Sequence, residues 1–157
     1  MKQSKDSPGV FIPPPLFYAA VFIISILLQR YFPIKSSFTH RIVTLIPGVI
    51  LIVAGQLFSI PALRQFLQTK NSLIPFKSAT SLQTGGVYSV SRNPMYTGLL
   101  LTYTGLAFIF GNYWTVILIP VLMAIVIYAV ILPEERYLSR AFGDQFESYK
   151  KAVRRWI

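Results

Sequence analysis

Four long apolar runs dominate this sequence and restrict what it can fold into. They cover about residues 13–32, 42–63, 94–110 and 113–132, and each approaches the ~20 apolar residues that a helix needs to cross a bilayer. The composition agrees, since 54% of the 157 residues are hydrophobic and 13% are charged, which is too apolar for a soluble domain. The sequence therefore predicts an all-α, integral membrane bundle of about four transmembrane helices, built as a single domain over residues 1–157.

The first two runs each admit a second interpretation. Lys2 and Lys5 precede the first run, as in a signal peptide, but no small-residue cleavage site follows it, so we expect a retained helix. Gln56 is the one strongly polar side chain of the second run, where an interhelical hydrogen bond explains it better than a substrate contact. We therefore interpret both runs as membrane helices, and neither gives a sign of chemistry.

The basic residues are distributed unevenly between the two ends of the predicted helices. Fifteen Lys and Arg stand against five Asp and Glu. Twelve of the fifteen fall in the N-terminal segment, the loop 64–93 and the tail 133–157, whereas Arg30, Lys35 and Arg41 lie at the other end. The positive-inside rule then places both termini in the cytoplasm. Anionic lipid head groups, rather than nucleic acid, are the expected counter-charge, because the cations lie beside apolar runs.

Missing residue types exclude several kinds of site. The sequence has no cysteine, which rules out disulfides, a thiol nucleophile and a cysteine-ligated metal. His40 is the only histidine, so a histidine zinc site or a catalytic triad has too few members. We expect no metal in this protein.

The tail after the fourth run carries a helical pattern. Its apolar residues recur at steps of three and four, and cations occupy much of the rest. This pattern predicts an amphipathic helix in the membrane interface, with cations toward head groups and aromatic rings toward acyl chains. Pro133 is expected to end the fourth helix, and a membrane anchor alone would explain the apolar stripe. The stripe consists of Leu138, Phe142, Phe146, Tyr149, Val153 and Trp156.

Two polar motifs lie at the membrane boundary. One is GGVYSVSRNPMYTG, residues 85–98, and the other is the pair Glu134 and Glu135 after Pro133. Each has an ordinary structural explanation, namely a turn and helix start for the first and a solvated helix N-terminus for the second. Carboxylates at a membrane boundary are nevertheless costly unless they are solvated, paired or used. Because only GN separates the third and fourth runs, a helical hairpin would bring both motifs to one membrane face.

These motifs resemble those of a known enzyme family. GVYSVSRNPMYTG, a hairpin, and then EERYLSRAFGDQFESYKKAVRRW are similar to the isoprenylcysteine carboxyl methyltransferases, with the phospholipid N-methyltransferases as relatives. The resemblance covers about residues 81–156 and implies an S-adenosylmethionine site on the cytoplasmic side, and we expect the tail helix, Leu138 to Trp156, to pack over that site. Besides the membrane lipids, it implies a small lipid-like or amphipathic methyl acceptor that enters from the bilayer.

The resemblance also implies which residues form that site. Arg92 and Glu135 are the catalytic candidates. A carboxylate or an aromatic face would favour the cofactor's sulfonium, and polar groups would bind its amino-acid part. The positions implied as cofactor-binding are Thr80, Ser81, Leu82, Gln83, Tyr88, Asn93, Pro94, Met95, Tyr96 and Glu134.

Two positions depart from the family pattern. Asn93 stands where the family has histidine, and because its amide cannot titrate near neutral pH, we interpret it as a ligand contact rather than a proton acceptor. Val130 stands where enzymes acting on prenylated cysteine have an arginine for the substrate carboxylate. A prenylcysteine acceptor is therefore disfavoured unless another cation, such as Arg154, replaces that arginine. The alternatives are a phospholipid amine N-methyltransferase and a non-enzymatic membrane scaffold.

Overall fold

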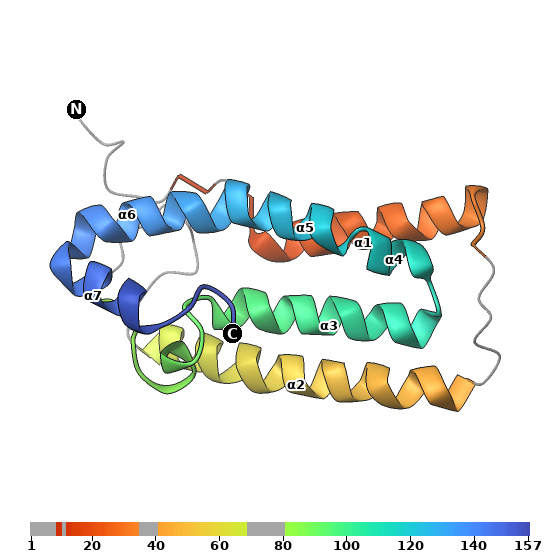
Figure 1. Ribbon diagram of the computed structural model, residues 1–157, viewed down its shortest axis with the longest axis horizontal. Coiled ribbons are helices and arrows are strands. Elements are labelled where there is room, and N and C mark those ends of the chain that lie inside the picture. Colours follow the sequence, from red (N-terminus) through yellow and green to blue (C-terminus); the bar gives the residue numbers. More distant parts are fainter. Residues whose placement is uncertain (1–8, 11, 35–40, 69–80) are drawn as a thin grey trace.

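The computed structural model describes residues 9–10, 12–34, 41–68 and 81–157 (Figure 1). Within these ranges all regular secondary structure is helical, as the sequence predicts. The α-helices are α1 Pro14–Tyr31, α2 Arg41–Gln68, α3 Pro94–Phe110, α4 Tyr113–Ile117, α5 Ile119–Val126, α6 Leu132–Phe142 and α7 Asp144–Ala152. A 3₁₀ turn, Gly86–Ser89, precedes α3, and a π-helical turn, Ile127–Ile131, joins α5 to α6.

The long helices lie side by side and alternate in direction (Figure 1). α2 and α3 form one closely packed antiparallel pair, and α1 lies against α4 and α5 while also contacting α3. α6 continues the line of α5, and α7 folds back toward the segment that precedes α3 (Figure 1). The start of α1, the end of α2, the start of α3 and the tail therefore meet at one end of the bundle.

Glycines bring the backbones of α2 and α3 into direct contact. Gly48 faces Gly105, and Gly55 faces Gly98. A Cβ placed on Gly55 would lie 2.5 Å from the carbonyl oxygen of Gly98, and one on Gly105 would lie 2.6 Å from that of Gly48. Between membrane helices such close approach is a main source of association, because van der Waals packing takes the place of the hydrophobic effect. The pair is therefore held by its backbones rather than by large side chains.

A side-chain hydrogen bond reinforces the same pair of helices. Gln56 Nε2 donates to Thr102 Oγ1 at 3.1 Å, from α2 to α3. This confirms the interhelical hydrogen bond predicted for Gln56.

The turn between α3 and α4 is as short as the sequence predicts. Gly111 has a φ of 61°, a left-handed conformation that glycine adopts without strain, and it ends α3. Asn112 then caps α4, because its side-chain oxygen accepts from Trp114 N at 3.0 Å. The Asn112 amide also donates to Ser25 Oγ at 3.2 Å, and the hydroxyls of Ser25 and Thr115 lie 2.8 Å apart. These bonds fix α1 against the hairpin.

The fourth apolar run forms a succession of helical segments, and Pro133 does not end it, contrary to the sequence prediction. Proline lacks an N–H, and its ring clashes with the carbonyl four residues earlier in a regular helix. The π-helical turn absorbs this conflict, since Leu132 N–H donates to the carbonyl of Ile127 and widens the turn just before the proline. The helix therefore continues and carries Glu134 and Glu135 into α6.

The tail is two helices rather than the single amphipathic helix that the sequence predicts. Gly143, with a φ of 50°, separates α6 from α7, and the backbone is extended at Val153. α6 projects along the bundle axis instead of lying across it (Figure 1). Phe146 and Tyr149 face the protein, at 1% and 8% exposed, so these aromatic rings are not turned toward acyl chains. The tail covers one end of the bundle, where Phe146 and Tyr149 of its apolar stripe are buried and its other members are partly buried.

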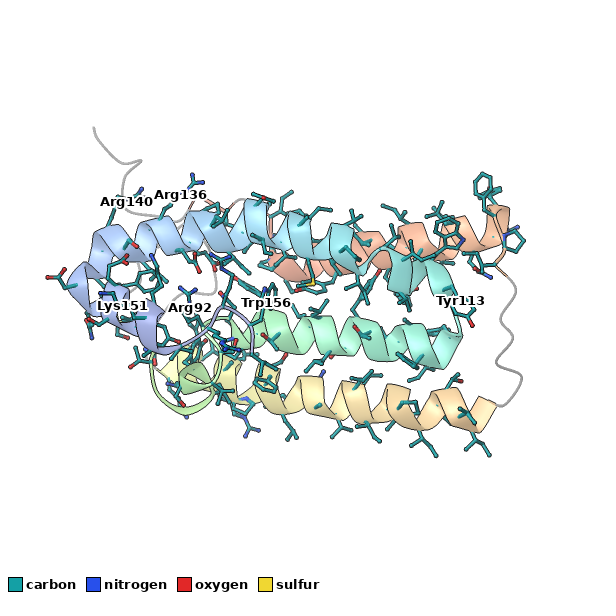
Figure 2. The ribbon with its side chains drawn as sticks, in the orientation of Figure 1. Arg92, Tyr113, Arg136, Arg140, Lys151 and Trp156 are labelled. Atoms are coloured by element: carbon teal, nitrogen blue, oxygen red, sulfur yellow. The ribbon has the colours of Figure 1, made fainter. Side chains whose placement is uncertain are left out.

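Among the described residues, two helices are long and apolar enough to cross a membrane, namely α1 and the stretch Ile42–Gln68 of α2, with mean hydropathies of 1.3 and 2.2. Their outer faces are lined with apolar side chains, whereas Arg136 and Arg140 project from α6 (Figure 2). These features indicate membrane association. α3 is apolar but has only 17 residues, and the fourth run is divided, so the four-span bundle stays a prediction. The exposed apolar residues of α2 are Ile42, Val43, Leu45, Ile46, Val49, Ile50, Val53, Leu57, Ile60, Leu63 and Leu67.

We expect the glycine contact between α2 and α3 to be needed for stability. In Gly55→Ala the new Cβ would meet the Gly98 carbonyl oxygen at 2.5 Å, so the free energy of unfolding should fall by about 1–3 kcal/mol. Helix propensity alone would act in the opposite direction, since it favours alanine over glycine by ~1 kcal/mol. The measurement is thermal unfolding of the purified protein in detergent.

Gly85→Ala is the matched control, because nothing lies within 4 Å of a Cβ at that position. An unchanged or higher melting temperature for Gly55→Ala would show that the backbones of α2 and α3 do not touch.

Candidate functional site

A cavity of about 480 Å³ lies at the end of the bundle where the tail meets the start of α3. Its walls come from the start of α1, the end of α2, the segment before α3, α3 itself, α6 and α7. Thr80 lies outside the described residues, and all the other site residues predicted from the sequence line this cavity. They are Ser81, Leu82, Gln83, Tyr88, Arg92, Asn93, Pro94, Met95, Tyr96, Glu134 and Glu135.

The segment 85–93, here called the motif loop, is held in shape by short-range and tail contacts. Gly86 has a φ of 60° and opens the 3₁₀ turn. Ser91 Oγ accepts from the backbone N–H of Asn93 at 3.1 Å, which turns the chain into α3. The Tyr149 hydroxyl of α7 donates to the carbonyl of Tyr88 at 2.6 Å. The loop is therefore fixed on one side by its own side chains and on the other by the tail.

Glu134 meets Tyr96 at the open end of the hairpin. The Tyr96 hydroxyl donates to Glu134 Oε1 at 2.7 Å, because α3 and the segments α4 to α6 return the chain to the end that it left. Burial raises the pKa of Glu134 to about 7, while the Tyr96 hydrogen bond lowers it and the charge of Glu135 raises it by a smaller amount. The Glu134 carboxyl therefore changes its protonation state near neutral pH.

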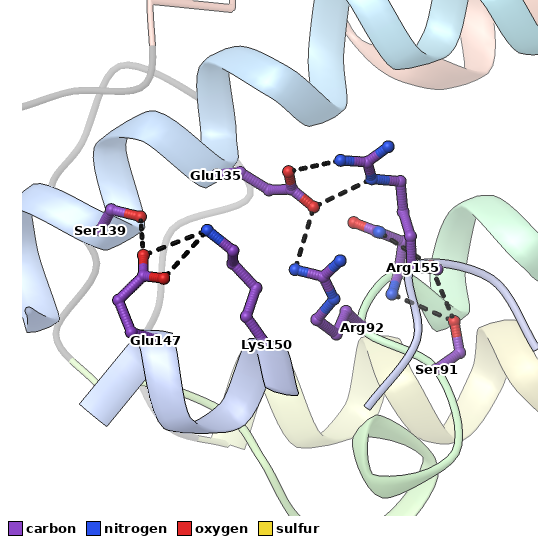
Figure 3. Close-up of polar contacts among 8 residues, drawn as sticks. Ser91, Arg92, Glu135, Ser139, Glu147, Lys150 and Arg155 are labelled. Carbon is purple, nitrogen blue, oxygen red and sulfur yellow. Dashed lines mark hydrogen bonds and ion pairs between the residues drawn. The ribbon is translucent and has the colours of Figure 1, made fainter. Parts of the chain in front are cut away.

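Glu135 is paired with two arginines (Figure 3). Arg155 donates through Nε to Oε1 at 3.0 Å and through Nη2 to Oε2 at 2.8 Å, which is a bidentate pair. Arg92 Nη1 lies 3.2 Å from Oε1, and only 14% of the Glu135 side chain and 11% of the Arg92 side chain are exposed. A carboxylate so far from water needs such compensation. Glu135 is thus a paired charge, whereas Glu134 has no cation bound to it among the described residues.

Residues 153–157, here called the C-terminal strap, follow α7 without regular secondary structure and cross the motif loop. Arg92 N donates to the carbonyl of Arg154 at 2.9 Å. The Asn93 side chain donates to the carbonyl of Arg155 at 2.9 Å, and Ser91 Oγ donates to the same carbonyl at 3.3 Å. The amide of Asn93, expected from the sequence as a ligand contact, therefore also binds the strap.

Arg155 is a candidate site residue that sequence reasoning missed. The sequence offered Arg154 as a substitute cation for a substrate carboxylate, which stays a prediction, whereas the residue that reaches Glu135 is Arg155. Arg154 contributes its backbone carbonyl to Arg92 N, whereas Arg155 contributes its side chain to Glu135. A helix end placed at Ala152 would have separated Arg155 from the helical pattern. The helical period predicted for the tail runs on to Trp156 and conceals that end.

Several buried polar atoms at the cavity have no hydrogen-bond partner within the part of the chain that the structure describes. They are Ser59 Oγ, the Tyr88 hydroxyl, and Nε and Nη1 of Arg92, whose Nη1 makes only the ion pair to Glu135. Buried polar groups are nearly always satisfied in proteins, so such groups at a cavity are typical of a ligand site. Among the described residues no group of His, Asp and Glu could hold a metal ion.

Apolar residues from the first two helices form one wall of the cavity. Residues 13–15, Leu63 and Phe66 contribute from α1 and α2, and Phe146 and Tyr149 contribute from α7. Sequence reasoning missed the α1 and α2 residues, because apolar residues in a membrane helix show no pattern that separates a cavity wall from a lipid-facing surface.

The sequence pattern of one known protein family covers most of this chain. It is the pattern of the phospholipid methyltransferases, and it matches residues 43–145. The chain belongs to the phospholipid methyltransferase family. The matched stretch contains α2, the motif loop, the hairpin and both glutamates, so the family region includes most of the cavity wall.

Similarity to individual proteins is partial. The chain is 33% identical over 72 residues to the protein-S-isoprenylcysteine O-methyltransferase of Schizosaccharomyces pombe, a match that covers 46% of this chain and 30% of that protein. It is also 33% identical over 63 residues to an uncharacterized protein of Haemophilus influenzae, which covers 40% of this chain and 100% of that protein. No solved structure matches the chain. The chain thus spans less than a third of the S. pombe enzyme's length.

Proposed function

We propose that this protein is an integral membrane methyltransferase that uses S-adenosylmethionine to methylate a lipid-like or amphipathic acceptor. The observation that carries the proposal is the cavity, where a polar motif loop and two glutamates face apolar residues of membrane-type helices. A polar methyl donor and an apolar acceptor need a site of this mixed character. Membership of the phospholipid methyltransferase family supports methyl transfer as the reaction.

The cavity residues fit S-adenosylmethionine in size and in chemical type. A volume of about 480 Å³ is within the ~300–1,000 Å³ of small-molecule sites. The Arg92 guanidinium, which makes a single ion pair through Nη1 and has no partner for Nε among the described residues, suits the carboxylate of the cofactor. Glu134 suits a cationic group, and Leu82 and Tyr88 offer apolar surface for a base. When bound, S-adenosylmethionine supplies an electrophilic methyl group attached to a sulfonium.

The chain itself would supply alignment, a dry environment and a proton acceptor. Methyl transfer by in-line displacement depends on holding the reacting atoms in line and on excluding water. Phe146 and Tyr149 cover the cavity from α7, which supports the exclusion of water. Because the pKa of Glu134 is about 7, its carboxylate could take a proton from an acceptor amine or hydroxyl. Asn93 cannot do so, since an amide does not titrate.

The acceptor is proposed to be lipid-like because one wall of the cavity is apolar and comes from α1, α2 and α3. Val130, at the position where prenylcysteine enzymes have arginine, is fully buried and is not among the cavity residues. It offers no charge for a substrate carboxylate. A phospholipid amine is the alternative acceptor, and membership of the phospholipid methyltransferase family favours it. A non-enzymatic scaffold is less favoured, because it would leave the unpaired polar atoms at the cavity without a ligand.

We further propose that the chain crosses the membrane several times, with both termini and the cavity on the cytoplasmic side. The distribution of Lys and Arg supports this orientation. The antiparallel helices also support it, since the start of α1 and the tail lie at the same end of the bundle (Figure 1). Reporter fusions at each terminus should both give the cytoplasmic signal, and a fusion between α1 and α2 should give the opposite one. Termini on opposite sides would contradict this topology.

The activity is tested by transfer of labelled methyl from S-adenosylmethionine into a membrane extract, followed by identification of the product. We expect a labelled lipid-like product with the wild type and a strongly reduced yield with Arg92→Ala. A farnesylcysteine analogue should be a poor acceptor, because Val130 carries no charge. Robust turnover of that analogue would instead show that another cation binds its carboxylate. The absence of any labelled product would favour the scaffold.

The role of Glu134 is tested by cofactor binding in detergent. A charge-assisted contact in a partly dry site contributes ~1.5–3 kcal/mol, so Glu134→Gln should weaken S-adenosylmethionine binding roughly ten- to a hundredfold. The wild-type affinity for S-adenosylmethionine should also rise as the pH increases through about 7, because the ionised Glu134 carboxylate attracts a cation and the neutral carboxyl does not. Glu134→Gln should lack this part of the pH dependence, and Tyr96→Ala should bind more weakly through lost packing. Equal affinity of Glu134→Gln and wild type by calorimetry would show that Glu134 does not contact the cofactor.

A further inference from the structure

Arg155 links the C-terminal strap to the cavity without touching it. Its carbonyl accepts hydrogen bonds from Ser91 and Asn93 of the motif loop, and its guanidinium binds Glu135 of α6 (Figure 3). The Arg155 side chain is 33% exposed and is not among the residues that line the cavity. Any effect of Arg155 on a ligand must therefore pass through another residue.

Two arginines share one carboxylate, and they share it unequally. Arg155 uses both oxygens of Glu135, at 3.0 Å and 2.8 Å. Arg92 approaches one of them, at 3.2 Å from Nη1, and neither its Nε nor its Nη1 makes a hydrogen bond within the described residues. A guanidinium binds a carboxylate best through two parallel N–H···O bonds. Because Arg155 already makes that pair, Arg92, a residue that lines the cavity, keeps Nε without a partner among the described residues and makes a single ion pair through Nη1.

We propose that Arg155 is a positioning residue: by holding Glu135 in a bidentate pair, it leaves Arg92 able to bind an anionic group of a ligand in the cavity. A carboxylate and a phosphate both meet this requirement. The inference rests on the proposed function for the nature of the ligand, since S-adenosylmethionine carries a carboxylate and a phospholipid acceptor carries a phosphate. Without Arg155, Glu135 would form the bidentate pair with Arg92 instead. The N–H donors of Arg92 would then no longer be available to the ligand.

A purely structural role for Arg155 leads to different results. If the strap only held the tail in place, loss of the Arg155 side chain would weaken all ligands alike, and its effect would add to that of a Glu135 variant. If Arg155 acts through Glu135, the two effects are coupled, because removal of the Glu135 charge also frees Arg92. A double-mutant cycle separates these cases.

The experiment is calorimetry of the full chain in detergent with S-adenosylmethionine and its decarboxylated analogue. Arg155→Ala should lower the affinity for S-adenosylmethionine roughly ten- to a hundredfold and leave that for the analogue nearly unchanged. Arg155→Lys should recover only part of the loss, because an ammonium cannot hold both oxygens in one fixed geometry. Adding Glu135→Gln to Arg155→Ala should restore most of the affinity. The matched control is Arg140→Ala, which removes an exposed arginine of α6 (Figure 2).

Each outcome decides the inference. If Arg155→Ala leaves cofactor affinity unchanged but raises the KM for phosphatidylethanolamine in phosphatidylcholine vesicles, the inference holds and the anion belongs to the acceptor. The inference is overturned if Arg155→Ala lowers the affinities for S-adenosylmethionine and for its decarboxylated analogue equally. It is also overturned if the losses of Arg155→Ala and Glu135→Gln add in the double variant. Both outcomes leave the proposed function intact. A wild type that binds neither cofactor and transfers no methyl group overturns the proposed function, and the inference with it.

Discussion

The carboxylate of Glu135 joins three parts of the chain that are far apart in sequence. It lies on α6, pairs with Arg92 of the motif loop and with Arg155 of the C-terminal strap, and is largely shielded from water. Removing one partner of such a buried cluster typically costs ~3–5 kcal/mol, because a charge is left without compensation. The other contacts at this end of the bundle, such as that of Tyr149 with the motif loop, connect only two segments at a time. This carboxylate and the hydrogen bonds of the motif loop to α7 and to the C-terminal strap together close this end of the bundle.

Glu134 and Glu135 are adjacent in sequence but have different chemical characters. Successive residues of an α-helix point about 100° apart, so Glu135 faces the two arginines while Glu134 faces the Tyr96 hydroxyl. Burial without a cation raises the pKa of Glu134 to about 7, whereas Glu135 is compensated by two guanidinium groups. The two neighbouring carboxyls therefore have different partners, a pair of guanidinium groups for Glu135 and a tyrosine hydroxyl for Glu134. The π-helical turn before Pro133 contributes to this arrangement, because it lets one continuous helix carry both residues past the proline.

Local patterns were enough to predict several parts of the fold, and they failed where distant contacts decide. The bounds of α1 and α3 agree with the apolar runs, and the GN turn and the Gln56 hydrogen bond were also foreseen. The tail was predicted as one interfacial helix packed over the cofactor site, yet Gly143 divides it into two helices, of which α7 places Phe146 and Tyr149 at the cavity. An apolar stripe specifies that a face will be buried, and whether lipid or protein covers it depends on the fold.

The sequence by itself determined the helical class, the short hairpin, and the return of the glutamate pair to the end of the bundle where the motif loop lies. These follow from apolar length and from the few residues in the turn, which are local properties. Only the tertiary structure decided that Arg155 rather than Arg154 binds Glu135, and that apolar residues of α1 and α2 complete the cavity. It also decided that Gly55 and Gly98 bring two backbones together. The physical reason is that these contacts depend on how each helix is rotated about its axis and on where α7 ends and the C-terminal strap begins, and no short stretch of sequence specifies either.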